Sequence, residues 1–346
     1  MLKQQGAWLR GSGPDADIVI SSRIRLARNL AGYPFISRIP EFDRRNIIRS
    51  FQATIDKVFD PDSFFFLEMD QLEAADRQYL LERQLVSREF VEDDKPRAVL
   101  IDRNEDFSVM VNEEDHLRIQ AMTSGFGFAS VWNRVNRLDD ALEHELPFAF
   151  DERLGYLTAC PSNLGTGIRV SVMLHLPAIL ETGEMERVFR GVQKINLAVR
   201  GIYGEGSRAL GDFYQISNQT TLGVSEDDLM ERLGNIIPRV IEYERRARDF
   251  LLENSREPLL DRCYRALGIL SSARRIGAEE AMGLLSSARL GWHMKLQNEI
   301  SVDKINDLLL HIQPAHLAKI ADRELDEETE SVFRAEYLRK RLAEKA

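Results

Sequence analysis

The segment Cys160–Ser171 constrains the fold of this chain more than any other stretch, because it places a cysteine, a tight turn and a strand arginine in a fixed order. Pro161 holds the chain extended after the cysteine, and Gly165 and Gly167 allow the backbone to approach a ligand closely. After the turn, apolar and polar residues alternate, which predicts a strand with one face toward the core. Arg169 then projects from the opposite face, where a cation suits an anionic ligand.

A second arginine-bearing strand is predicted within Ser21–Arg28, where apolar residues again occupy alternate positions. Arg23 and Arg25 are two residues apart, so their guanidinium groups project from the same face. Taken alone, this pattern is more typical of a solvated strand face than of a ligand site. Arg28 could equally form a surface salt bridge.

The cysteine segment resembles the signature of the phosphagen (guanidino) kinases, which transfer the γ-phosphoryl group of ATP to a guanidinium nitrogen. Three further segments are similar to parts of that family: its first nucleotide-binding strand, its catalytic-carboxylate segment and the mobile loop of arginine kinases. They lie at residues 21–28, 112–118 and 200–205. Four segments in the family's order are hard to obtain by chance.

The resemblance implies a binding site for ATP and Mg²⁺ beside a pocket for a guanidinium group. Five arginines align with the nucleotide ligands of the family: Arg23, Arg25, Arg118, Arg169 and Arg200. Convergent cations suit this chemistry, because phosphoryl transfer depends on positioning the triphosphate and neutralising its charge.

The guanidinium pocket implied by the resemblance consists of Glu114, Glu205 and Cys160. A guanidinium is a poor nucleophile, so a carboxylate has to orient it and remove its proton, which is the role implied for Glu114. The Cys160 thiolate would contact the guanidinium without a covalent intermediate. Without the motif, Glu114 would be interpreted as part of an acidic turn, Glu205 as a solvated loop tip and Cys160 as a small buried apolar residue. That last interpretation is retained for Cys263.

Composition describes a globular protein and excludes several classes. The 346 residues, 44% of them hydrophobic, suffice for two domains, and a net charge of −10 argues against general nucleic-acid or membrane-surface binding. The two cysteines form no CxxC pair, and neither a signal region nor a membrane-spanning run is seen, so a cytoplasmic protein is expected. His116 and His175 lack the spacing of metal ligands, so no metal-binding residue is assigned.

The predicted fold class is α+β, with a largely antiparallel sheet flanked by helices, because no regular βαβ alternation appears. Strands are expected at 17–21, 98–102, 107–111 and 168–174, and helices at 44–59 and 72–86. A capping box at Ser225–Asp228 predicts the start of a long helix that reaches about Leu252 with an interruption at Pro238. The sequence after Asn254 is helical in pattern, with breaks near Gly277, Asn298 and Pro314.

We therefore divide the chain into a phosphagen-kinase-like catalytic domain, residues 1–254, and an all-helical C-terminal domain, residues 255–346, that binds substrates or partners. Only twenty residues precede Ser21, where kinases of small guanidines carry a helical domain that closes over the substrate. This layout, with family-like segments at 261–268 and 308–314, resembles the McsB-type bacterial protein arginine kinases.

The resemblance implies an ATP-dependent kinase of arginine side chains in proteins, which marks them for Clp-type proteolysis in the stress response or alters their activity. Its partners would be proteins with exposed arginine, with an activator protein, a Clp unfoldase or protease and a homodimer also to be considered. Two alternatives stay open: a kinase of free arginine that stores phosphoarginine, and a catalytically idle adaptor that presents arginine-bearing proteins to a protease.

Overall fold

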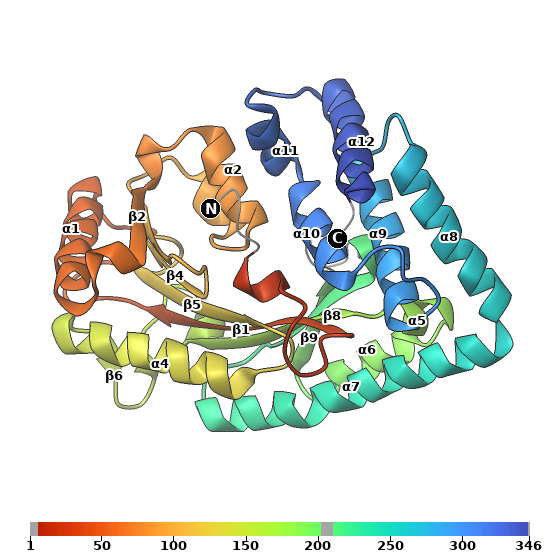
Figure 1. Ribbon diagram of the computed structural model, residues 1–346. Helices are drawn as coiled ribbons and strands as arrows, with labels where there is room; N and C mark the ends of the chain where they lie inside the picture. The colour runs from red at the N-terminus through yellow and green to blue at the C-terminus, as the bar shows by residue number, and fades with distance from the viewer. Residues whose placement is uncertain (1–5, 202–209, 345–346) are drawn as a thin grey trace. The chain divides into compact units, whose positions relative to one another are not determined.

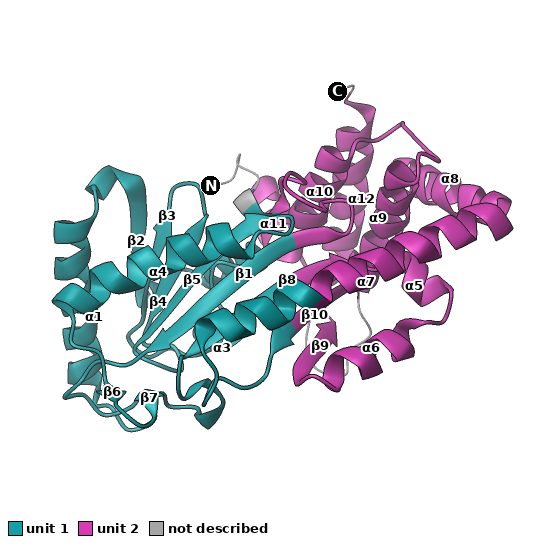
Figure 2. Cartoon of the chain, turned by 90° about the horizontal axis from the view of Figure 1, so that it is seen from below, with its two compact units in different colours: residues 1–8, 21–172, 217–235 teal, residues 9–20, 173–216, 236–346 magenta. Residues whose placement is uncertain are grey.

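The computed structural model describes residues 6–201 and 210–344, and the chain divides into two compact units (Figure 2). Each unit combines stretches that are distant in the sequence. Unit 1 comprises residues 1–8, 21–172 and 217–235, and unit 2 comprises residues 9–20, 173–216 and 236–346.

Within the described residues, eight strands form one sheet, in the order β2-β3-β4-β5-β1-β8-β10-β9 (Figure 1). Their bounds are β1 Val19–Arg28, β2 Phe64–Glu68, β3 Ala98–Asp102, β4 Phe107–Val111, β5 Leu117–Ser124, β8 Ile168–His175, β9 Leu197–Gly201 and β10 Phe213–Asn218. The neighbouring strands from β2 to β1 all pair antiparallel, as do β6 (Phe150–Asp151) and β7 (Gly155–Tyr156) in a separate ribbon. The predicted α+β class with an antiparallel sheet is confirmed.

Strand β1 is longer than either sequence pattern indicated, since it begins at Val19, inside the predicted run 17–21, and continues to Arg28. Ile24 and Leu26 are fully buried on one face, while Arg23 and Arg25 on the other face are only half-buried. This difference follows from the alternation of side chains along a strand. It leaves the arginines on a face that a ligand can reach.

The described part of unit 1 contains α1 (Glu41–Val58), α2 (Ala74–Glu82), α3 (Arg88–Glu92), α4 (Phe128–Glu145) and the first part of α7 (Glu226–Asn254). The helix predicted at 72–86 was too long. It ends earlier because Gln84 takes a left-handed backbone conformation, with φ of 61°. The neighbouring Arg83 is fully buried and pairs with Glu105 at 2.7 Å.

Helix α7 (Glu226–Asn254) begins with the predicted capping box. The Asp228 amide donates to Ser225 Oγ at 3.1 Å, and the Ser225 amide donates to Asp228 Oδ2 at 3.4 Å. The predicted interruption at Pro238 is wrong, because α7 continues through it as one helix. Its apolar positions stay in helical register on both sides of the proline, and Leu233, Ile237 and Ile241 are all buried.

The predicted helical character of the C-terminal region is confirmed. It forms α8 (Arg256–Ser272), α9 (Ala278–His293), α10 (Val302–His311), α11 (Pro314–Ala321) and α12 (Glu327–Ala343), while α5 (Pro177–Glu181) and α6 (Met185–Gln193) lie earlier in unit 2. The expected breaks separate these helices, and Asp322, with φ of 53°, adds one that was not predicted. No helix in the described ranges is both long and apolar enough to cross a membrane.

Candidate active site

Three of the five predicted nucleotide ligands share one face of the sheet because of the register between β1 and β5. Arg118 on β5 lies opposite Ala27 on β1, two residues beyond Arg25, and directly opposed residues point to the same face. Arg23, Arg25 and Arg118 therefore project together. Only the pairing of β1 with β5 shows that Arg118 lies on the same face as Arg23 and Arg25.

Arg169 joins this group from β8, the neighbour of β1 on its other side. The Ala27 amide donates to the Gly167 carbonyl at 2.9 Å, which fixes β8 beside the C-terminal half of β1. Arg169 Nη2 donates to Ser217 Oγ on β10 at 3.0 Å, so its side chain is held from the next strand as well. The structure thus brings together four of the five predicted arginines, all in unit 1.

The positive charges of these four side chains act on one another. Burial, followed by the nearby charges of Arg118 and Arg169, lowers the pKa of Arg23 to about 10. Burial and the same neighbours, together with Arg23, hold the pKa of Arg25 well below its ordinary value. The negative charge of Glu113 acts in the opposite direction. The buried Nε of Arg25 has no hydrogen-bond partner among the described residues. A cluster of this kind favours a bound anion with several negative oxygens.

The three consecutive acids after Asn112 are anchored differently. Glu113 is buried, pairs with Arg118 and accepts a hydrogen bond from Ser87 Oγ at 2.5 Å. Asp115 is also buried and accepts from Asn29 Nδ2 at 2.6 Å and from the Ala159 amide at 2.7 Å. Glu114, between them, is left with a more open side chain, so it is the acid available to a substrate.

Glu114 and Cys160 are brought into contact. Cys160 is half-buried, and its sulfur lies 3.0 Å from Ser162 Oγ. It is close enough to Glu114 to act against the rise in the pKa of that carboxyl. Asn163 Nδ2 donates to Glu114 Oε2 at 3.4 Å. Burial raises the pKa of Glu114, and the negative charges of Asp115 and Glu113 raise it further. A carboxylate with a raised pKa beside a thiol is a suitable partner for a cationic acceptor group.

The turn after Cys160 is fixed by backbone contacts that require glycine. Gly165 has φ of 108°, and a Cβ on it would lie 2.7 Å from the Thr221 carbonyl oxygen. Gly167 has φ of 65°, and its Cβ would lie 2.6 Å from the Ala27 carbonyl oxygen. Thr221 Oγ1 also donates to the Ser162 and Leu164 carbonyls at 3.0 and 2.7 Å. These contacts set the position of the cysteine relative to β8.

Arg28 was considered as a surface salt-bridge partner, and that interpretation is wrong. It is only 2% exposed and pairs with Asp139 on α4 at 2.7 Å. Its guanidinium also donates to the Thr166 carbonyl at 2.9 Å and lies 3.6 Å from the centroid of the Tyr156 ring. Arg28 therefore ties the end of β1 to α4 and to the glycine turn.

Arg200 lies half-buried on β9 in unit 2, and Glu205 lies outside the described residues, so their roles stay predictions. In the described part of the chain no group of three or more His, Cys, Asp or Glu side chains could hold a metal ion. Sequence reasoning did not single out Glu113, Ser87 or Asn163, although Glu113 stood within the acidic run.

Several known proteins and one family model are similar to this chain in sequence or in fold. The family model "ATP:guanido phosphotransferase, C-terminal catalytic domain" matches residues 46–247. The chain is similar to a solved lombricine kinase, with a TM-score of 0.60 and 26% identity over 68% of each chain. It shares its fold with the duplicated taurocyamine kinase from Schistosoma mansoni, at a TM-score of 0.61 and 24% identity over 81% of this chain and 40% of that one. The chain belongs to the ATP:guanido phosphotransferase family.

Within this family, the chain belongs with the protein-arginine kinases. Residues 256–346 match the model "Protein-arginine kinase McsB C-terminal domain". A "Protein-arginine kinase" of Symbiobacterium thermophilum is 44% identical over 99% of this chain and 98% of its own length. Another, from Brevibacillus brevis, is 42% identical over 97% of this chain and 94% of its own length.

Proposed function

We propose that this chain is an ATP-dependent protein-arginine kinase, which transfers the γ-phosphoryl group of ATP to arginine side chains of proteins. The observation that carries the proposal is the convergence of four arginines on one sheet face, with Glu114 and Cys160 in contact with each other in the same unit. Relatives that match nearly the whole chain carry the name protein-arginine kinase.

The nucleotide would be held by the arginine cluster. Arg23, Arg25, Arg118 and Arg169 supply the charge that a triphosphate needs, and the unsatisfied Nε of Arg25 is a donor ready for a phosphate oxygen. Arg200 is proposed as a fifth ligand. When bound, Mg²⁺ would neutralise phosphate charge, and it would be held mainly by phosphate oxygens and water, as is common for this ion.

In the transfer step, a lone pair of the acceptor guanidinium nitrogen forms the N–P bond while the bond from the γ-phosphorus to the bridging oxygen breaks and ADP leaves. The nitrogen loses a proton, for which Glu114 is the proposed acceptor. Cys160 would orient the guanidinium from beside Glu114, and Glu205 is proposed as the second carboxylate. Most of the catalytic effect would come from positioning and charge neutralisation.

The alternatives differ in acceptor or in activity. A kinase of free arginine would use the same four cations and Glu114, but the match of residues 256–346 to the McsB C-terminal domain favours protein acceptors. An idle adaptor is disfavoured by the presence of each of these residue types at the site. An activator protein, a Clp unfoldase or protease, homodimer formation, a stress-response role and a cytoplasmic location are further parts of this proposal.

The decisive experiment offers γ-labelled ATP with Mg²⁺ to the full chain, with either free arginine or a casein-like protein as acceptor. We expect label on the protein, and mass spectrometry should place it on arginine. The linkage is a phosphoramidate, so the label should be lost in acid and survive alkali. Label that survives acid, or that appears only on free arginine, would contradict the proposal.

A further inference from the structure

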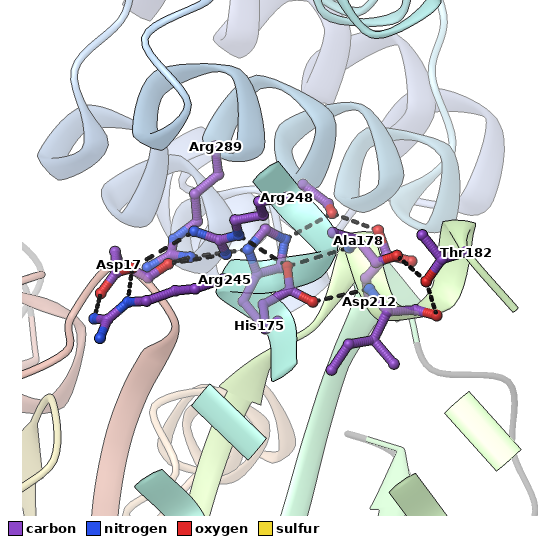
Figure 3. Close-up of polar contacts among 11 residues, drawn as sticks. Asp17, His175, Ala178, Thr182, Asp212, Arg245, Arg248 and Arg289 are labelled. Carbon is purple, nitrogen blue, oxygen red and sulfur yellow. Dashed lines mark hydrogen bonds and ion pairs between the residues drawn. The ribbon is translucent and has the colours of Figure 1, made fainter. Parts of the chain in front are cut away.

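Arg289 on α9 is fully buried and donates hydrogen bonds to the backbone just before β1, the strand that carries Arg23 and Arg25 (Figure 3). Its Nη2 donates to the Ala16 carbonyl at 2.7 Å and its Nη1 to the Asp17 carbonyl at 3.1 Å. Nη1 also lies 2.9 Å from Nδ1 of His175. Burial lowers the pKa of Arg289 to about 9. Burying a charged guanidinium costs folding free energy unless hydrogen bonds satisfy it, so these contacts are needed to keep Arg289 in the interior.

The hydrogen bonds around Arg289 have one consistent direction. A guanidinium can only donate, so His175 Nδ1 is the acceptor and its Nε2 carries the proton. Nε2 then donates to Ser286 Oγ at 2.8 Å, and Ser286 Oγ donates to Asp212 Oδ2 at 2.7 Å. The chain of donors starts at a cation and ends at a carboxylate, an arrangement in which each bond polarises the next. Figure 3 shows Arg289, His175 and Asp212 within one group of residues joined by polar contacts.

This group sits where two neighbouring strands of the sheet come together. His175 is the last residue of β8, and its amide donates to the Ile18 carbonyl at 2.8 Å, immediately before β1. Arg289 therefore holds the start of β1 through residues 16–17 and the end of β8 through His175. A slip of one residue along a strand moves its side chains by about 3.3 Å and turns them to the other face.

The same two strands carry three of the four clustered arginines. Arg23 and Arg25 follow the held segment on β1, and Arg169 precedes His175 on β8. The charge of Arg169 lies close enough to lower the pKa of both Arg23 and Arg25, and the charge of Arg23 lowers the pKa of Arg25 as well. Mutual repulsion would separate such groups, so their spacing has to be imposed by the strands.

We propose that Arg289 is a positioning residue for the nucleotide site: through the Ala16 and Asp17 carbonyls and His175, it fixes the relative register of β1 and β8 and so the spacing of Arg23, Arg25 and Arg169. His175, Ser286 and Asp212 complete this device. Through these contacts, α9 contributes to ATP binding. The inference rests on the proposed function, because it assumes that the arginine cluster binds the nucleotide.

Arg334 provides a matched control. It is 1% exposed, lies on α12 in the same unit and also donates to two backbone carbonyls, those of Ile312 at 2.8 Å and Ile276 at 3.2 Å. Its contacts hold only C-terminal helices together. Arg289→Met and Arg334→Met should both lower stability, since each removes a buried, hydrogen-bonded arginine.

The experiment measures the dissociation constant of ATP by calorimetry in the full chain, at a temperature where circular dichroism shows both variants folded. Arg289→Met should weaken ATP binding about tenfold, the equivalent of one charge-assisted contact, and Arg334→Met should leave it unchanged. The KM for ATP should rise while the KM for the protein acceptor stays the same. Arg289→Lys should restore part of the affinity for ATP, because lysine keeps the positive charge but lacks the planar set of N–H donors of a guanidinium.

Equal ATP affinity in the two methionine variants would overturn the inference and assign Arg289 a purely structural role. If Arg289→Met does not fold, Ser286→Ala decides, since it breaks the same chain of hydrogen bonds at a smaller group. Weakened ATP binding in that variant supports the inference, and wild-type binding overturns it. A wild-type chain that fails to bind ATP would instead refute the proposed function.

Discussion

Glu113, Glu114 and Asp115 are adjacent in the sequence, yet their surroundings give them different chemistry. Burial acts to raise the pKa of Glu113, but Arg118 and a hydrogen bond from Ser87 hold it below its ordinary value. Burial raises the pKa of Asp115, against the hydrogen bonds that it accepts. Glu113 thus pairs with the arginine cluster, and Asp115 is held by the Asn29 side chain and the Ala159 amide. Only Glu114 is placed to act on an acceptor.

The proposed division of roles predicts opposite effects for two substitutions. Glu114→Ala should abolish phosphoryl transfer and leave the dissociation constant of ATP within about threefold, because Glu114 contacts the acceptor. Arg169→Ala should weaken ATP binding by about 10- to 100-fold, the effect of one lost charge-assisted contact. Calorimetric titration with ATP and a transfer assay measure the two effects. Equal losses of ATP affinity would refute the division.

The raised pKa of Glu114 predicts the acid limb of the pH profile. Glu114 has to be ionised to take a proton, so kcat/KM should fall as the pH decreases through a value above the ordinary 4.5. Glu113→Gln removes one of the negative neighbours that raise this pKa, so the limb should move to lower pH. A limb at or below 4.5, or one that does not move in the variant, would exclude Glu114 as the base.

At the scale of elements, the glycine turn decides where Cys160 lies relative to β8. Gly165→Ala would place a Cβ 2.7 Å from the Thr221 carbonyl oxygen and 2.9 Å from Leu222 Cα, at a φ of 108°. We expect a loss of about 1–3 kcal/mol in the free energy of unfolding, together with reduced transfer activity. Urea unfolding monitored by circular dichroism measures the first effect.

Gly234→Ala is the control for that substitution. Gly234 lies inside α7, and a Cβ there would meet no heavy atom within 4 Å. Alanine is the better helix former by up to about 1 kcal/mol, so this variant should be as stable as the wild type or slightly more stable. If Gly165→Ala proves equally harmless, the turn does not depend on the contacts described for it.

The elements that could be predicted are those specified by local pattern. The strands at 98–102 and 107–111 have the predicted bounds, because short apolar runs between turn segments are read directly from the sequence. The start of α7 followed from its capping box. The continuation through Pro238 and the burial of Arg28 depend on partners distant in the chain, which no local pattern contains.

The candidate site could also be predicted only in part, because its contacts join residues distant in the chain. Strand alternation placed Arg23 and Arg25 on one face, but their proximity to Arg118 requires the pairing of Ala27 with Arg118. The contact of Glu114 with Cys160 joins segments that are far apart in sequence. The family resemblance had assigned these residues to one site, but it did not give the strand pairing or the contact itself. The role of Arg289 could not be found this way, because nothing in its local sequence marks it as a residue that binds the segment before β1.

At the scale of the whole molecule, the core of unit 2 includes residues on both sides of residue 254. Ala178 and Leu251 pack in one cluster with Leu259, Cys263 and Leu290. Cys263 is fully buried, which agrees with its interpretation as a small apolar residue. The functional division of the chain at residue 254 stays a prediction. Because of this shared core, substitutions in the full chain are better tests of the C-terminal helices than truncations.

Unit 2 also predicts a specific sensitivity to acid. Burial and the charges of Arg289 and Arg248 lower the pKa of His293 to about 3, from an ordinary value of 6.5. Below pH 6.5 the unfolded chain therefore binds a proton at this position that the folded chain does not bind until about pH 3. The stability that depends on neutral His293 is complete above pH 6.5 and is lost as the pH falls through this window.

The non-titrating variant His293→Asn isolates this contribution from the buried carboxylates. Relative to the variant, the wild type should lose up to about 1.4 kcal/mol of unfolding free energy for each pH unit below 6.5. Above that pH the difference between the two proteins should be constant, because the histidine is neutral in both states. Urea unfolding of both proteins between about pH 8 and pH 5 measures the difference. Parallel stability curves over the whole range would mean that His293 titrates alike in the folded and unfolded chains, and that the environment set by Arg289 and Arg248 does not reach it.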